Sequence, residues 1–153
     1  MNHSDLFVEV NIIADLQATD KRSVLEEMID YAIEKELIPK NKKKTVIEAL
    51  LAREQLGSTG LGNGIAIPHV KIKGFHNDLA LAARSIRGVD FKSVDGEAVN
   101  VFFLLVSSAE QADRHLSILQ WISRIARHQD FKSFVRGAKD AKEIVGILKE
   151  IGG

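Results

Sequence analysis

A histidine follows a short apolar segment and one of the two prolines in this chain. The sequence there reads Ile65-Ala66-Ile67-Pro68-His69. The proline ring fixes its own φ and biases Ile67 toward extended backbone, so the segment predicts a stiff strand end that aims the imidazole. Imidazole is a competent nucleophile for covalent catalysis, and open α/β sheets place ligands at the ends of strands. The alternative is a histidine that only satisfies hydrogen bonds at a strand end.

A glycine-rich segment precedes this strand. Four of the 11 glycines lie between Gly57 and Gly64. Glycine permits positive φ and lets backbone N–H groups approach a ligand, so the segment predicts an anion-binding nest. It is not a P-loop, because Asn63-Gly64 stands where Lys-Ser/Thr is required, and its spacing does not match a dinucleotide fingerprint. The alternative is a long turn between a helix and a strand, which glycine clusters mark more often.

Two further residues have side chains suited to holding an anion. Arg53 occupies the last turn of a predicted helix, four residues before Gly57, where it can reach an anion held by the loop. The alternative is a cation that the helix macrodipole favours at a C-terminus. His115 opens a later helix on an apolar face, which is typical of a hydrogen-bonded core histidine. Because helix N-termini disfavour imidazolium, His115 is also suited to donate a hydrogen bond to a phosphoryl oxygen while neutral.

Hydrophobic periodicity predicts the elements that must position these side chains. Apolar residues at helical spacing predict helices over residues 21–37, 42–56, 111–128, 131–139 and 141–151. Strands are predicted over residues 65–68, 79–87 and 99–107, with 7–13 as an additional N-terminal strand. The nearly continuous apolar run of the third strand is typical of a central strand covered on both faces. Helices before and after a group of strands predict a layered α/β fold, as a single domain over residues 1–153.

Composition excludes several classes of function. The chain has 153 residues, of which 45% are apolar, enough for one domain with a hydrophobic core. Its 21 basic residues cancel its 21 acidic residues, which argues against general nucleic-acid binding. The chain has no cysteine, so disulfides and thiolate metal sites are excluded. The longest apolar run, Val101 to Val106, is far too short to insert into a membrane, and we expect a cytoplasmic protein.

The five histidines have no metal-binding spacing, so we expect neither a metal nor a cofactor. We expect His3 to be disordered, and His76 and His128 to lie on the surface.

The sequence Gly57-Ser58-Thr59, followed by Leu61-Gly62-Asn63-Gly64-Ile65-Ala66-Ile67-Pro68-His69, resembles the enzyme IIA domains of the bacterial phosphotransferase system. The resemblance is to the mannitol/fructose class, and most of all to its nitrogen-regulatory type. It covers nearly the whole chain, including Arg53-Glu54, Asp95-Gly96-Glu97-Ala98-Val99 and His115-Leu116. It implies a mixed β-sheet of about four to five strands flanked by helices on both faces.

The resemblance also implies a mechanism. The active-site histidine corresponds to His69, which accepts a phosphoryl group from HPr or its nitrogen-branch counterpart. The second histidine corresponds to His115 and the arginine to Arg53. Because phosphoryl transfer mainly needs stabilisation of spread negative charge, backbone N–H groups of the loop also fit this chemistry. The predicted phosphoryl-binding loop consists of Gly57, Ser58, Thr59, Gly60, Gly62, Asn63 and Gly64. The protein is then a phosphotransferase component that carries phosphate rather than turning over a small substrate.

One departure from the family keeps alternatives open. A small residue, typically glycine, follows the histidine in the family, whereas this chain has the stiffer and bulkier Val70. A nitrogen-regulatory phosphocarrier that acts on regulated target proteins is the first interpretation. The second is a sugar-transport component that passes phosphate to a fructose- or mannitol-type IIB domain. A binding module that no longer transfers phosphate and a metal-independent hydrolase using His69 are the alternatives from other classes.

Overall fold

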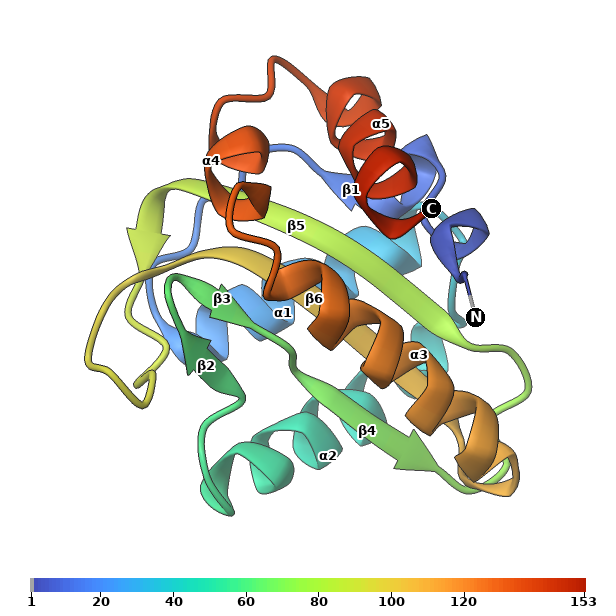
Figure 1. Cartoon of the computed structure of the whole chain (residues 1–153). Helices are drawn as coiled ribbons and strands as arrows, with labels where there is room; N and C mark the ends of the chain where they lie inside the picture. The colour runs from blue at the N-terminus through green and yellow to red at the C-terminus, as the bar shows by residue number, and fades with distance from the viewer. Residues whose placement is uncertain (1) are drawn as a thin grey trace.

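The computed structural model describes residues 2–153, in which a six-stranded sheet lies between two layers of helices (Figure 1). The domain predicted over residues 1–153 therefore includes Met1, which lies outside the described residues. The helices are α1 (Lys21–Glu34), α2 (Lys43–Gln55), α3 (Ala112–Ala126), α4 (Phe131–Arg136) and α5 (Ala141–Gly152). The strands are β1 (Ile12–Ile13), β2 (Gly60–Gly62), β3 (Ile65–Ala66), β4 (His69–Ile72), β5 (Leu79–Val89) and β6 (Val99–Ser108).

The sheet is mixed, as predicted. Its order is β1-β5-β6-β3-β2, and β4 pairs with β6 beyond the end of β3. β5 and β6 are antiparallel, whereas β3 and β4 run parallel to β6. The sheet has six strands rather than four to five, because two short strands were not predicted. β2 has the sequence Gly-Leu-Gly, and β4 has only two apolar residues, Val70 and Ile72, so each is too short for a clear strand pattern.

Alternating side chains of the two long strands build one hydrophobic core on each face. Leu79 and Leu81 of β5, with Leu104 of β6, pack against α1 and α2. Ala80 of β5 and Phe103 of β6 face the opposite core, which α3, α4 and α5 complete. Figure 1 shows α3 crossing in front of the sheet and α1 behind it. The prediction that residues 99–107 form a central strand covered on both faces is therefore confirmed.

The helix boundaries agree with the predictions to within a few residues. The Asp20 side chain caps α1 by accepting the Ser23 N–H at 2.9 Å. α1 ends at Glu34, before the predicted residue 37, because Glu36 adopts a φ of +58° that a helix cannot continue. Among the helices of residues 2–153, none is long and apolar enough to cross a membrane.

Two N-terminal predictions are wrong. Only Ile12–Ile13 of the predicted strand 7–13 is extended, and a 3₁₀ turn over Glu9–Asn11 precedes it. Phe7 is instead fully buried, stacked on Trp121 of α3 at 5.8 Å between ring centroids. His3 is also ordered, since it is 7% exposed and its Nε2 lies 2.9 Å from Ser117 Oγ. The N-terminal segment is thus held by its contacts with α3, which its own sequence does not reveal. His76 and His128 are exposed, as predicted.

Candidate active site

His69, His115 and Arg53 line one depression of about 450 Å³ at the edge of the sheet. The three side chains come from different elements, namely the first residue of β4, the first turn of α3 and the last turn of α2. β4 pairs with β6 and packs against α2, so the depression lies where the two helical layers meet this strand. The structure therefore brings together the three residues that sequence analysis singled out for catalysis. The depression is lined by Ala49, Ala52, Arg53, His69, Val70, Lys71 and His115.

The backbone around His69 determines which ring nitrogen is free. His69 Nδ1 lies 2.6 Å from the carbonyl oxygen of Ile67. A carbonyl oxygen only accepts hydrogen bonds, so Nδ1 must carry the proton and the neutral ring keeps its lone pair on Nε2. The adjacent Pro68 carbonyl accepts the Leu105 N–H at 3.0 Å, which ties this segment to the central strand. The predicted strand 65–68 ends at Ala66, and His69 is instead the first residue of β4, because Pro68 has no N–H to donate to a neighbouring strand. Its ring keeps Nε2 as the available nucleophilic atom.

The electrostatic surroundings keep His69 neutral. Burial lowers the pKa of His69 below its ordinary value of 6.5, and the positive charges of Arg53 and Lys71 lower it further. The hydrogen bond to Ile67 and the negative charge of Glu54 oppose these effects without reversing them. A neutral imidazole has a nucleophilic lone pair, whereas an imidazolium does not.

The His115 ring lies beside the His69 ring and forms a hydrogen bond with Ser107. The two ring centroids lie 5.8 Å apart, with the planes tilted by 44°. His115 is 4% exposed, and its Nδ1 lies 2.8 Å from the fully buried Ser107 Oγ. Burial above all, then the charge that His69 carries when protonated and the charge of Lys71, lowers the pKa of His115 to about 4. If the Ser107 hydroxyl donates to Nδ1, the single ring proton is on Nε2, where it can be donated into the depression.

Arg53 and its neighbour Glu54 act on different sides of the helix end. The Arg53 guanidinium donates to the Gly57 carbonyl at 3.0 Å, which leaves other N–H groups for a ligand. The buried Glu54 carboxylate pairs with Lys21 Nζ at 2.9 Å and accepts the Thr59 N–H at 3.1 Å. Thr59 Oγ1 also donates to it. Glu54 therefore fixes the start of the glycine-rich loop to α2. Glu54 was not among the predicted site residues, although its position beside Arg53 in the family-like segment was a signal.

The glycine-rich loop forms a hairpin over most of its length, and the Thr59 carbonyl at its start accepts the Ile67 N–H at 3.0 Å. Gly60–Gly62 and Ile65–Ala66 form the β2–β3 hairpin, and Asn63 and Gly64 turn it with φ of +57° and +78°. Positive φ at both central residues is the requirement of a type I′ turn, for which Asn-Gly is preferred. Gly62 and Asn63 line a different depression, together with residues that follow α3. The predicted phosphoryl-binding role of the loop stays a prediction, and the Gly57 carbonyl is the loop group that accepts a hydrogen bond from Arg53 within residues 2–153.

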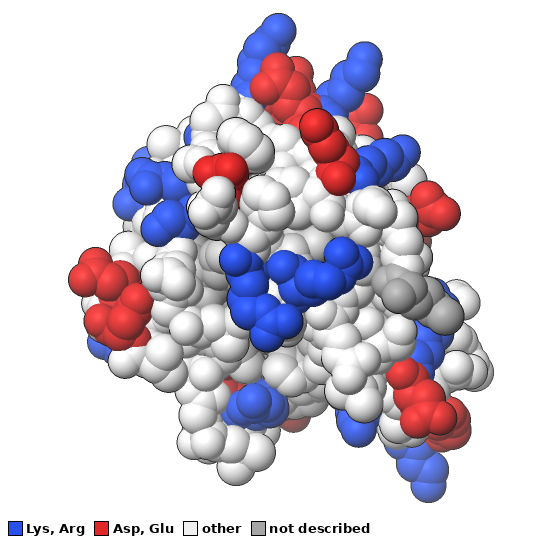
Figure 2. Space-filling view, viewed as in Figure 1, with Lys and Arg blue, Asp and Glu red and all other residues white. Residues whose placement is uncertain are grey.

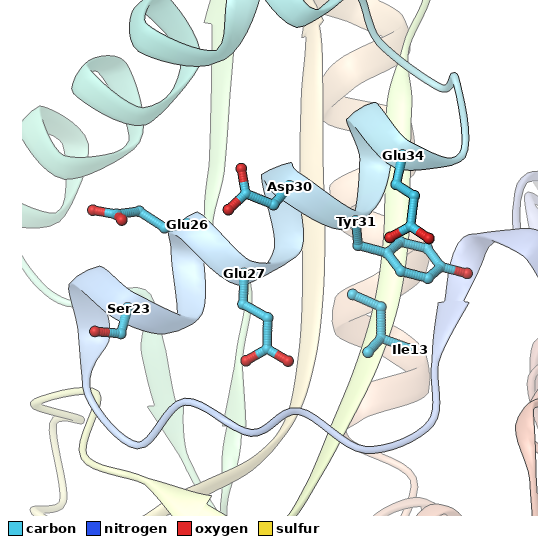
Figure 3. Close-up of a pocket in the computed structure, with 7 residues that line it drawn as sticks. All are labelled: Ile13, Ser23, Glu26, Glu27, Asp30, Tyr31 and Glu34. Carbon is cyan, nitrogen blue, oxygen red and sulfur yellow. The ribbon is translucent and has the colours of Figure 1, made fainter.

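An acidic depression lies along α1 (Figure 3). Two of its carboxylates have structural roles. Glu27 accepts the N–H groups of Gln17 and Ala18 at 3.0 and 2.8 Å, and Asp30 pairs with Lys43 at 2.7 Å. Figure 3 shows Glu26 and Glu27 pointing away from one another. Within residues 2–153, no three histidine or carboxylate side chains gather closely enough to hold a metal ion.

The comparisons with known proteins agree with this geometry. The family "Phosphoenolpyruvate-dependent sugar phosphotransferase system, EIIA 2" matches residues 5–151. The chain belongs to this family. This IIA domain is 35% identical to a nitrogen regulatory protein of Bradyrhizobium diazoefficiens, over 95% of the chain and 93% of that protein. It is 29% identical to a fructose-specific EIIA component of Haloferax volcanii, over 86% of the chain and 84% of that protein.

A solved structure supports the same assignment. The crystal structure of the nitrogen regulatory protein IIA-Ntr from Neisseria meningitidis matches this IIA domain with a TM-score of 0.85 and 27% identity. The match covers 95% of this chain and 97% of that one. The predicted family and the predicted mixed α/β fold are thus confirmed.

Proposed function

We propose that this IIA domain is a phosphocarrier that accepts a phosphoryl group on His69 Nε2 and acts as a regulator through its phosphorylation state. The donor is a phosphohistidine of an HPr-like carrier protein. The observation that carries the proposal is the hydrogen bond from Nδ1 to the Ile67 carbonyl, which leaves the Nε2 lone pair free in a depression shared with His115 and Arg53. The similarity to nitrogen regulatory proteins supports the regulatory role.

In the proposed transfer, the Nε2 lone pair of His69 forms a new N–P bond while the N–P bond to the donor imidazole breaks. The leaving electron pair returns to the donor nitrogen. Charge on the phosphoryl oxygens spreads in the loose transition state, so donors around the depression stabilise it. Arg53 and a neutral His115 supply such donors, and the Lys71 ammonium adds positive charge. The phosphorylated domain gains about −1.5 to −2 charges at this site, which changes its electrostatic fit to partners.

The decisive experiment measures the intact mass of the protein after incubation with a phosphorylated HPr-like donor. We expect the wild-type chain to gain one phosphoryl group and a folded His69→Ala variant to gain none. His115→Ala and Arg53→Ala should keep the acceptor atom but slow transfer by about 10²-fold, the effect of losing one well-placed donor. Complete loss of labelling in a folded His115→Ala protein would mean that the roles of the two histidines are wrongly assigned. Normal rates for Arg53→Ala would make Arg53 a helix-end cation only.

A sugar-transport role is the second candidate, and the similarity to a fructose-specific EIIA component favours it. The purified phosphorylated domain should be mixed with fructose- and mannitol-type IIB domains. Rapid stoichiometric transfer of the phosphoryl group to one of them would replace the regulatory interpretation. If no donor phosphorylates the chain, it is a binding module instead. The Val70→Gly variant would then test whether the bulky residue beside His69 prevents transfer. A cytoplasmic location is part of the proposal, since the chain must share a compartment with its donor.

A further inference from the structure

A depression of about 630 Å³ lies between the turn of the β2–β3 hairpin and the loop that joins α3 to α4. One wall is Leu61, Gly62 and Asn63 of the hairpin, and the other is residues 126–129 with Lys132 of α4. Ile65, which is buried, also lines it. None of these residues lines the depression of His69, so the two sites are separate. The volume falls within the range of small-molecule sites, about 300–1,000 Å³.

The charged side chains that line this depression are both positive. They are Arg127 and Lys132, which line it together with the imidazole of His128, and no aspartate or glutamate is among the lining residues. Among residues 2–153, neither the Arg127 guanidinium nor the Lys132 ammonium has a carboxylate within 4.0 Å. Figure 2 shows Lys and Arg side chains gathered over the region where Figure 1 places the C-terminal end of α3. In a chain with no net charge, this local excess of positive charge favours an anionic ligand.

The Asp95 carboxylate, which lies beside Gly62, already accepts two hydrogen bonds. One oxygen of Asp95 accepts the Asn63 N–H at 3.1 Å, and the other accepts the Glu97 N–H at 3.0 Å. Its carboxylate is thus used to hold the hairpin turn and the loop before β6. Its charge reduces the positive potential at Lys132 without forming an ion pair with it.

Local contacts position His128 and Lys132 beside the depression. The Asp130 N–H donates to His128 Nδ1 at 3.2 Å, so the neutral His128 ring carries its proton on Nε2 and can donate from there. Gly64 leaves room for Lys132, since a Cβ at this position would be only 3.0 Å from Lys132 Cδ. The lysine stem therefore lies across the hairpin turn with its ammonium beside the depression.

The remaining wall is apolar. Leu61 is 52% exposed at the hairpin, and Ala126 lies opposite it at the end of α3. We propose that this depression binds a phosphorylated small molecule of mononucleotide size. Its phosphoryl oxygens are held by Arg127, His128 and Lys132, and its apolar ring packs against Leu61 and Ala126. Arg is suited to phosphate because its planar fork matches two oxygens, whereas Lys and His add single donors.

The test is an NMR titration of the ¹⁵N-labelled full-length chain with ADP, AMP, adenosine and inorganic phosphate. ADP should shift the amide signals of residues 61–65 and 127–132 in a saturable way, with a Kd of about 1 mM or tighter. Adenosine, which has no phosphate, should bind at least tenfold more weakly. Arg127→Gln and Lys132→Gln should each weaken ADP binding about tenfold, the effect of one charge-assisted hydrogen bond. Lys139→Gln is the matched control, since it removes one exposed positive charge elsewhere.

The same titration with His69→Ala separates this site from the phosphorylation site. ADP should bind this variant with unchanged affinity, whatever becomes of the proposed phosphocarrier function. The proposal is overturned if ADP shifts the signals around His69 and His115 instead, or if Lys132→Gln binds ADP as the wild type does. If Arg127→Gln lowers the free energy of unfolding but leaves ADP binding unchanged, Arg127 stabilises only the end of α3 through the helix macrodipole and does not hold phosphate. Equal binding of adenosine and ADP would exclude phosphate recognition.

Discussion

Replacing His115 with glutamine should remove a large part of the acid sensitivity of this fold. The folded protein holds the pKa of His115 at about 4, whereas an unfolded histidine has the ordinary value of 6.5. Between these pH values the unfolded chain binds the proton and the folded chain does not, so protonation favours unfolding. The contribution of His115 to stability is therefore complete above pH 6.5 and is lost as the pH falls toward 4.

The magnitude follows from the two pKa values. Each pH unit between them costs about 1.4 kcal/mol, so the whole loss is about 3 kcal/mol. At pH 5 about 2 kcal/mol of it has already occurred. Glutamine keeps a polar side chain near Ser107 but does not titrate, so the variant should lack this loss. With a urea m-value of about 2 kcal/mol/M, the wild type should lose about 1 M more of its unfolding midpoint between pH 7 and pH 5 than His115→Gln does.

The assay is urea unfolding of both proteins at several pH values, followed by circular dichroism. Because both proteins share every other titratable group, the difference between their pH profiles isolates His115. The exposed His76→Gln variant controls for the exchange of histidine for glutamine. A constant difference between wild type and His115→Gln across this pH range would refute the reasoning, since it would mean that burial does not keep His115 neutral.

Two further predictions concern residues behind the site. Glu54→Ala should lower the free energy of unfolding by about 3–5 kcal/mol in chemical denaturation, because it leaves Lys21 and Thr59 without their buried partner; Glu54→Gln, which keeps an acceptor, should lose less. Ser107→Ala should slow phosphorylation of the chain about tenfold and change the ¹⁵N signals that report the tautomer of His115, because one hydrogen bond of about 1.4 kcal/mol then no longer fixes Nδ1. An unchanged tautomer in Ser107→Ala would leave Ser107 a packing residue.

Local patterns in the sequence were enough to predict most of the elements. The apolar run of residues 99–107 identified the central strand, and apolar residues at helical spacing identified α1, because both patterns are set by neighbouring residues. The predicted strand 7–13 was wrong because contacts distant in sequence, rather than neighbouring residues, determine the structure of this segment. Phe7 and His3 are held by α3, more than a hundred residues away in sequence, and no local pattern reports such a contact.

The sequence by itself determined the residue types of the candidate site and the rigid backbone at Pro68 that precedes His69. Only the tertiary structure decided which side chains meet. Pairing of β4 with β6 places His69 opposite Leu105, and the packing of α2 and α3 around that edge brings Arg53 and His115 to it. The β2–β3 hairpin takes up most of the glycine-rich loop, and Gly62 and Asn63 line a different depression from that of His69. Sequence spacing fixes the order of these groups along the chain, whereas strand register and helix packing fix the distances on which chemistry depends.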